Sequence, residues 1–259
     1  MQKYFAKKSL GQNFLKSKFI LDQIIESAQI NSNDLILEIG PGKGSLTEKL
    51  LEKAQKVIAI EKDDRLIPIL QEKFAQEIQS GKLELVHGDV LDFDPKKLTA
   101  NSYKLVANLP YYLTGQIFRK FLETENQPSL MVLLVQKEVA KRIVSPKGSI
   151  LSISVQVFGK PKYVSTVKKT YFRPQPKVDS AILLIDQISN PFQSSEEREK
   201  FFLILKSGFA QKRKKLISNL KKNYIAGDLE GAFSSCGLKV NARAEELDLE
   251  KWKCLASNL

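Results

Sequence analysis

The stretch Asn108-Leu109-Pro110-Tyr111 follows directly on a short apolar run that predicts a buried strand. The Asn108 side chain offers a carbonyl oxygen, and Leu109, held extended by Pro110, offers its backbone carbonyl. Tyr111 adds an aromatic face beside these two acceptors. This set can bind a planar heterocycle that carries an exocyclic amine. A strand that simply ends at a proline before buried tyrosines is the competing interpretation, so the rest of the chain must decide.

A glycine-rich loop, Gly40-Pro41-Gly42-Lys43-Gly44, lies between an expected strand and an expected helix. Glycines there allow a tight turn and let a ligand approach the backbone without meeting a Cβ atom. The spacing matches neither GxGxxG nor GxxxxGK[ST], the signatures of dinucleotide and phosphate loops. The loop therefore favours an adenosyl ligand without phosphates, with a plain glycine-rich turn as the alternative.

Two acids follow the next two expected strands. Glu61 ends the second strand, where a carboxylate can accept hydrogen bonds from both hydroxyls of a ribose. Asp89 follows the third strand and is placed to accept a hydrogen bond from an adenine amine, although a turn or helix-cap aspartate is the alternative.

The segments that must position these residues alternate between β-rich and helical patterns, which predicts a Rossmann-like α/β fold with ligands at the carboxyl ends of a parallel sheet. Residues 149–158 fit helix or strand, and two antiparallel strands are expected before residue 188. A capping box at Ser194 and Glu197 opens a helical region. We therefore expect a catalytic domain over residues 1–188 and a small helical domain over residues 189–259. The expected parallel strands are Leu35–Ile39, Val57–Ile60, Leu83–Val86, Lys104–Ala107 and Leu130–Val135.

The net charge of +12 is unevenly distributed. Residues 1–21, 159–178 and 201–225 hold 18 of the 41 Lys and Arg residues and no acid, a pattern typical of a surface that binds nucleic acid. No transmembrane or signal segment is evident, so a cytoplasmic protein is expected. Cys236 and Cys254 lack metal-site spacing and His87 is the sole histidine, so we expect neither a metal site nor a disulfide.

Taken in order, the motifs GQNFL, EIGPGKG, Glu61, GDV, NLPYY and YFRPQPKVDS resemble those of the S-adenosylmethionine-dependent rRNA adenine N6,N6-dimethyltransferases. GFAQKRKKLISNLK and RAEELDLEKW resemble the second domain of the small-subunit rRNA branch, so the resemblance covers nearly the whole chain. It implies S-adenosyl-L-methionine as cofactor and dimethylation of two adjacent adenosines in a hairpin near the 3′ end of small-subunit rRNA. The implied partner is an assembling small ribosomal subunit, and a monomer is the default expectation.

The same resemblance implies roles for individual residues. Asn108 and Leu109 would accept hydrogen bonds from the adenine amine, Pro110 would fix the turn, and Tyr111 and Phe172 would stack on the base from opposite sides. Residues 1–21 and a helix around Lys212–Lys222 would contact RNA phosphates. The implied cofactor-binding residues are Asn13, Leu15, Gly40, Gly42, Glu61, Asp89 and Asn108.

Two features depart from the family pattern. Gly115-Gln116 stands where a proline is expected, and residues 143–151 form a short link without the usual aromatic residue, so the shape of the RNA entry is open.

Three alternatives remain. One is a large-subunit rRNA adenine N6-methyltransferase of the antibiotic-resistance type. Another is a non-catalytic RNA-binding assembly or transcription factor on the same fold. The third, a nicotinamide-dependent dehydrogenase, lacks the expected loop and a hydride-transfer acid.

Overall fold

The computed structural model describes residue 7, residues 10–98 and residues 102–259. The expected RNA-binding segment, residues 1–21, is therefore described only at residue 7 and from residue 10 onward. Contacts divide the chain into two compact units. The first comprises residues 1–140 and 159–190, and the second comprises residues 141–158 and 191–259. The chain passes from one unit to the other after residues 140, 158 and 190. The expected boundary at residue 188 lies close to the last of these points only. Residues 141–158 join the second unit because α7 (Ile150–Gln156) packs against α8 (Ser195–Gly208).

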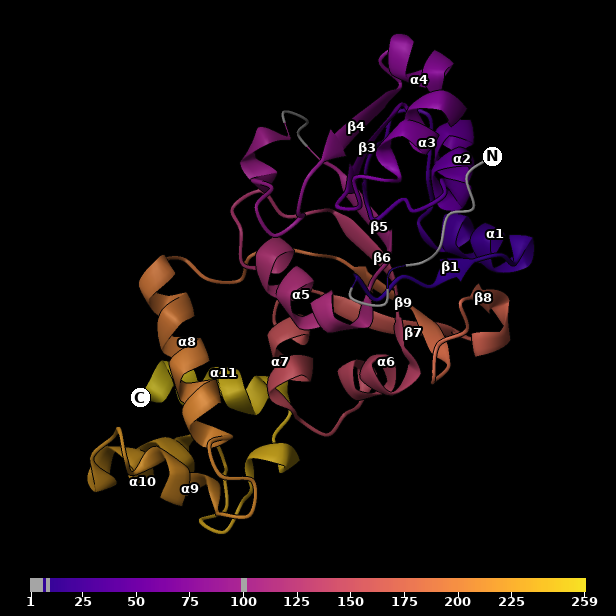
Figure 1. Cartoon of the computed structure of the whole chain (residues 1–259). Helices are drawn as coiled ribbons and strands as arrows, with labels where there is room; N and C mark the ends of the chain where they lie inside the picture. The colour runs from indigo at the N-terminus through magenta and orange to yellow at the C-terminus, as the bar shows by residue number, and fades with distance from the viewer. Residues whose placement is uncertain (1–6, 8–9, 99–101) are drawn as a thin grey trace. The chain divides into compact units, whose positions relative to one another are not determined.

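The first unit is built on a seven-stranded sheet with the order β4-β3-β2-β5-β6-β9-β7. Strands β4, β3, β2, β5 and β6 are parallel, β9 is antiparallel to β6, and β7 is antiparallel to β9. This topology confirms the predicted Rossmann-like α/β class (Figure 1). The strands are β2 (Leu35–Ile39), β3 (Lys56–Glu61), β4 (Leu83–His87), β5 (Lys104–Asn108), β6 (Leu130–Gln136), β7 (Lys160–Val167) and β9 (Ser180–Asp186).

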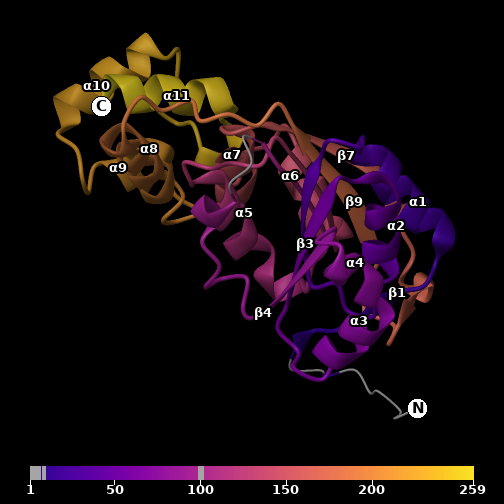
Figure 2. The same ribbon diagram turned by 90° about the horizontal axis from the view of Figure 1, so that it is seen from above.

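Helices cover both faces of this sheet, which is why its central strands are almost continuously apolar. Figure 2 shows α2 (Ser45–Lys53) and α3 (Ile67–Lys73) on one side of the strands and α5 (Thr114–Leu122) on the other. Helix α1 (Lys18–Ser27) packs beside α2, and the short α4 (Ala75–Gln79) follows α3. In β6 every residue except Gln136 is buried, as burial from both faces requires.

Strands β2 and β5 are neighbours although β3 and β4 separate them in the sequence. The chain leaves β2 toward β3 and leaves β5 toward β6, in opposite directions across the sheet. Such a switch point opens a crevice at the carboxyl ends of the two strands. The glycine-rich loop follows β2 and Asn108 ends β5, so the predicted binding residues meet at this crevice.

The second unit is helical. Residues 150–156 form a helix rather than a strand, and Ser194 caps the next helix by accepting a hydrogen bond from the Glu197 N–H at 3.2 Å. The predicted helix around Lys212–Lys222 is shorter than expected, because only Leu216–Leu220 is α-helical. The division between the units falls within α6 (Lys137–Val144), after residue 140. The other helices of the second unit are α7 (Ile150–Gln156), α8 (Ser195–Gly208), α9 (Leu216–Leu220), α10 (Ala226–Ser235) and α11 (Leu249–Asn258). No described helix is long and apolar enough to span a membrane.

The expectation that Cys236 and Cys254 stay unpaired is wrong. Cys236 caps the end of α10 and forms a disulfide with Cys254 of α11, with the two Cα atoms 5.7 Å apart. The two residues are far apart in sequence and have no motif spacing, so only the packing of α10 against α11 brings them together. Among the described residues no group of His, Cys, Asp or Glu side chains could hold a metal ion.

Gly208, the last residue of α8, provides a test of packing in the second unit. The Trp252 side chain is fully buried, and a Cβ atom at position 208 would lie 2.4 Å from its ring and 2.7 Å from Leu216. We expect Gly208→Ala to lower the unfolding free energy by about 1–3 kcal/mol through overpacking, measured by chemical denaturation. Gly231→Ala is the control, because its Cβ would meet nothing within 4 Å and alanine favours the interior of α10. Equal effects of the two changes would contradict the packing argument.

Candidate active site

All eleven residues predicted to bind or react line one pocket in the first unit. They come from the segment before α1, from the last residues of β3 and β5, from the loops after β2, β4 and β5, and from β8 (Phe172–Arg173). The sheet brings them together because the carboxyl ends of parallel strands share one edge. The eleven are Asn13, Leu15, Gly40, Gly42, Glu61, Asp89, Asn108, Leu109, Pro110, Tyr111 and Phe172.

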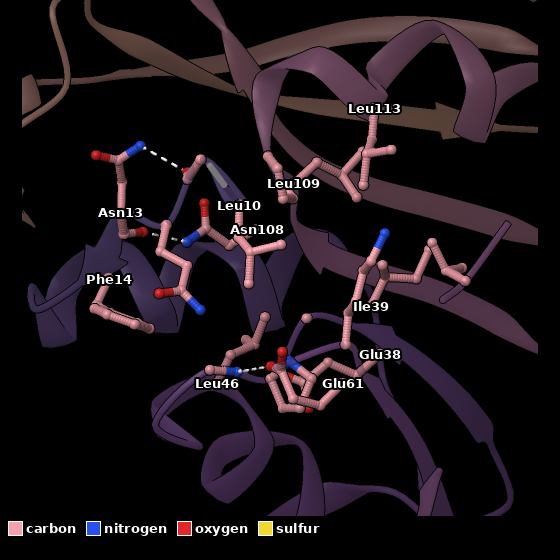
Figure 3. A pocket seen from close by; sticks show the side chains of 18 of the residues that line it. Leu10, Asn13, Phe14, Glu38, Ile39, Leu46, Glu61, Asn108, Leu109 and Leu113 are labelled. Atoms are coloured by element: carbon pink, nitrogen blue, oxygen red, sulfur yellow. Dashed lines mark hydrogen bonds between the residues drawn. The ribbon is translucent and has the colours of Figure 1, made fainter. Parts of the chain in front are cut away.

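Asn108 has a fixed orientation at the end of β5. Its side-chain Nδ2 donates a hydrogen bond of 3.0 Å to the backbone carbonyl of Asn13, whose own Nδ2 donates to the carbonyl of Gly11 (Figure 3). Since the amide nitrogen is engaged, the other end of the Asn108 amide presents an acceptor, the Oδ1 atom. An amine donates hydrogen bonds, so an amine-bearing ligand requires an acceptor of this kind.

The backbone after Asn108 supplies a second acceptor. The Leu109 N–H donates to the carbonyl of Leu134 in β6 at 3.3 Å, which ties this turn to the sheet. The Pro110 carbonyl accepts from the Leu113 N–H, and the Tyr111 carbonyl accepts from the Thr114 hydroxyl, each at 3.0 Å. No hydrogen bond reaches the Leu109 carbonyl from the described part of the chain, so it stays available to a ligand.

The two predicted stacking rings are held by different contacts. The Tyr111 hydroxyl shares a hydrogen bond of 2.8 Å with the hydroxyl of Ser180 in β9, and burial raises the Tyr111 pKa. Phe172 is 5% exposed and pairs with Leu15, because β8 forms a two-stranded antiparallel sheet with β1 (Phe14–Leu15). A predicted cofactor contact and a predicted base contact are thus neighbours in one small sheet.

Glu61 is buried at the end of β3 and is bound by backbone donors. Its Oε2 accepts from the Gly42 N–H at 3.0 Å, and its Oε1 accepts from the Asp63 N–H at 2.8 Å. Burial raises the Glu61 pKa, while these two N–H groups act in the opposite direction. A carboxylate has about four acceptor positions, so both oxygens can still accept bonds from ligand hydroxyls.

Asp89 is engaged in an ion pair at the pocket rim. Its Oδ2 lies 2.6 Å from the Lys62 ammonium, and its Oδ1 accepts from the Leu91 N–H at 2.9 Å. Partial burial raises the Asp89 pKa, but Lys62 and Leu91 together hold it below its ordinary value. Asp89 therefore carries a negative charge that a ligand amine can share with Lys62.

Glu38 lines the same pocket and was not identified from the sequence. It is 1% exposed, and its Oε2 has no hydrogen-bond partner in the described part of the chain. Burial raises the Glu38 pKa to about 8, and the nearby Glu61 carboxylate contributes to the rise. The sequence feature that could have identified Glu38 is its position near the end of β2, two residues before Gly40. Glu61 has a similar position at the end of β3.

The glycine loop fits the backbone approach expected for an adenosyl ligand. Gly40 and Gly42 have φ angles of +68° and +61°, in the left-handed region that favours glycine. A Cβ atom at Gly40 would meet nothing within 4 Å, whereas one at Gly42 would lie 2.9 Å from the Phe14 ring. The loop leaves open space at Gly40, and the unsatisfied Glu38 oxygen suits a ligand that can form a hydrogen bond with it.

Glu38→Gln tests the buried carboxyl through the pH dependence of stability. Glu38 binds a proton up to about pH 8 in the folded protein, and its ordinary pKa is 4.5. Its contribution to stability is therefore complete below pH 4.5 and is lost as pH rises toward 8. We expect the unfolding free energy of the wild type to fall, relative to the variant, by up to about 1.4 kcal/mol per pH unit in that window. Denaturation curves that stay parallel from pH 5 to 8 would contradict this.

Comparisons with known proteins identify the family of this chain. The sequence matches the family described as ribosomal RNA adenine dimethylase over residues 4–259. Ribosomal RNA small subunit methyltransferase A of Dehalococcoides mccartyi strain CBDB1 is 41% identical, over 96% of this chain and 87% of the relative. The protein of the same name from Alkaliphilus oremlandii is 38% identical, over 100% of this chain and 94% of the relative.

Two solved structures are similar to this chain over most of its length. The 23S rRNA methyltransferase ErmE aligns with a TM-score of 0.77 and 26% identity, covering 95% of this chain and 99% of its own. A dimethyladenosine transferase from Plasmodium falciparum aligns with a TM-score of 0.76 and 28% identity, covering 93% and 95%. With a family match that spans nearly the whole sequence and relatives that match along almost all of it, this chain belongs to the ribosomal RNA adenine dimethylase family.

Proposed function

We propose that this chain transfers methyl groups from S-adenosyl-L-methionine to the N6 amines of two adjacent adenosines in a hairpin near the 3′ end of small-subunit rRNA. Family membership supports the reaction class. The observation that carries the proposal is the orientation of Asn108, whose amide nitrogen is bound by Asn13 so that its oxygen is left for a donor. The Leu109 carbonyl provides the second acceptor at the same strand end.

The chain's residues would activate and orient the amine. The lone pair of an adenine amine is delocalised into the ring, so the amine is a poor nucleophile. Hydrogen bonds to Asn108 Oδ1 and the Leu109 carbonyl would hold it in a more tetrahedral geometry, while Tyr111 and Phe172 would grip the extruded base. When bound, S-adenosylmethionine supplies a methyl group that the amine nitrogen accepts, and the sulfonium becomes a thioether. The proton of the methylated amine leaves to solvent, so no strong base is needed, and His87 does not line the pocket.

The cofactor would lie along the strand ends from β4 to β2. Glu61 would accept the ribose hydroxyls, and Asp89 would accept the adenine amine while it keeps its bond to Lys62. The Gly40 and Gly42 loop would pass beside the methionine end, which Asn13 and Leu15 would cover from the N-terminal segment. These assignments fit the positions of the residues around the pocket, and Glu38 faces the same space.

The partner we propose is the assembling small ribosomal subunit. In the second unit, the basic groups Lys212–Lys215, Lys221 and Lys222 are all exposed and can contact phosphates, which position an RNA without reading its sequence. The proposed subunit substrate supports a cytoplasmic location, and one chain supplies every residue of the proposed site, which supports a monomer.

A large-subunit rRNA methyltransferase is the second candidate, because ErmE shares the fold as closely as the dimethyladenosine transferase does. Sequence identity favours the small-subunit target. It is 41% and 38% to the two small-subunit relatives and 26% to ErmE. The target is therefore the property to test first.

We expect radiolabelled methyl groups from S-adenosylmethionine to appear on unmodified small subunits as dimethyladenosine at two neighbouring adenosines. Large-subunit rRNA serves as the parallel substrate, and nuclease mapping locates the label. Label found in large-subunit rRNA alone would assign the chain to the second candidate. Binding of cofactor and RNA without any transfer would indicate a non-catalytic assembly factor.

Asn108→Ala removes the proposed side-chain acceptor. We expect methyl transfer to fall by at least about 100-fold, because the amine loses its orientation. Cofactor binding, measured by calorimetry, should persist at least in part. Asn33→Ala is the matched control, since Asn33 is an exposed turn residue before the amino end of β2. Near wild-type transfer by the Asn108 variant would remove the amine-binding role.

A further inference from the structure

The N-terminal segment Leu10–Leu15 crosses the carboxyl ends of three adjacent strands. At the β5 end, Asn13 accepts the bond from Asn108. Over the loop after β2, the Phe14 ring lies where a Cβ atom at Gly42 would approach it within 2.9 Å. At the β3 end, Gln12 Nε2 donates to Asp63 Oδ2 at 2.7 Å.

Asp63 is the buried anchor of the β3 end. It is 1% exposed, and it accepts bonds from Arg65 Nε at 2.9 Å and Arg65 Nη2 at 2.6 Å, as well as from the Arg65 N–H at 3.2 Å. A two-pronged guanidinium contact of this kind fixes both oxygens of a carboxylate in position. Asp63 therefore presents its Oδ2 to Gln12 with little freedom to move.

The same residue also orients Glu61. The Asp63 N–H donates to Glu61 Oε1 at 2.8 Å, so one short turn after β3 determines where the Glu61 carboxylate points. The Gln12 amide is held at its other end as well, because its Oε1 accepts from the Lys7 N–H at 2.7 Å. Asp63 thus links Glu61, which lines the pocket, to the N-terminal segment that covers the pocket.

We propose that Asp63, held by Arg65, is a positioning residue for the methyl-transfer reaction. It does not line the pocket, but it places Gln12, and through Gln12 the Asn13 and Leu15 side of the segment, against the cofactor. This inference rests on the proposed function. The expected consequence is specific. Loss of the contact between Gln12 and Asp63 weakens cofactor binding and leaves RNA binding unchanged.

The test combines Gln12→Ala, Asp63→Asn and the double variant in the full chain. We expect each single change to raise the KM for S-adenosylmethionine about tenfold or more with little change in kcat, the scale of one hydrogen bond to a charged group. The KM for the small-subunit substrate should not move. The double variant should be no worse than the more affected single variant, because both changes remove the same contact.

Asp34→Asn is the matched control. Asp34 forms a half-buried ion pair with Lys104 at 2.8 Å, but it precedes β2 and so lies at the amino end of the sheet. It should lose thermal stability without a change in the cofactor KM. If Asp63→Asn does not fold, the Gln12→Ala variant tests the proposal alone. A wild-type KM for S-adenosylmethionine in the Gln12→Ala variant would overturn the proposal.

Two further outcomes separate this inference from the proposed function. Fully additive effects in the double variant, or an Asp63 effect on melting temperature alone, would reduce Asp63 to a structural role. A wild-type protein that binds no S-adenosylhomocysteine in calorimetry and transfers no methyl group would overturn the proposed function itself.

Discussion

The site depends on the constraint that five parallel strands end at one edge and that the N-terminal segment crosses this edge. The bond between Asn108 and the Asn13 carbonyl is the central contact of this arrangement. It holds the segment against β5, and it determines which end of the Asn108 amide is left for a ligand. The same atoms therefore close the pocket and set its hydrogen-bonding polarity.

The pocket concentrates acidic groups in a chain whose net charge is +12. Glu38 and Glu61 lie buried within the same pocket, and burial raises the pKa of both. Glu61 is satisfied by two backbone N–H groups, whereas one oxygen of Glu38 is unsatisfied among the described residues. Buried polar groups without partners are costly, and they concentrate where a ligand completes the arrangement. A ligand that forms hydrogen bonds to these carboxyl groups is the kind that such a lining favours.

The fold and the chemistry carry different parts of the functional argument. Enzymes named for large-subunit and for adenosine-dimethylating activities align with nearly equal TM-scores, so the architecture does not separate them. The pocket residues describe a reaction on an adenine amine, which both targets would share. We therefore expect discrimination between RNA targets to depend on surfaces outside the pocket, and the basic residues of the second unit are exposed.

The sequence by itself determined the sheet and most of the pocket. Each expected parallel strand differs from the observed one by two residues or fewer in total. The central strands are buried on both faces and are therefore nearly continuous apolar runs with sharp ends. The predicted site residues all reached one pocket for the same reason, since motifs at strand ends must meet at one edge. Their individual roles remain predictions, based on the resemblance and the chemistry of their side chains.

Only the tertiary structure decided the contacts between distant segments. The Cys236–Cys254 disulfide, the return of residues 141–158 to the second unit, and the link from Gln12 to Asp63 all join positions with no periodic or motif relation. Glu38 belongs with them, because its protonation follows from complete burial rather than from its neighbours in sequence. Local patterns specify which element a residue joins. Burial and the pairing of polar atoms depend on which other elements pack against it, and the complete fold alone sets that.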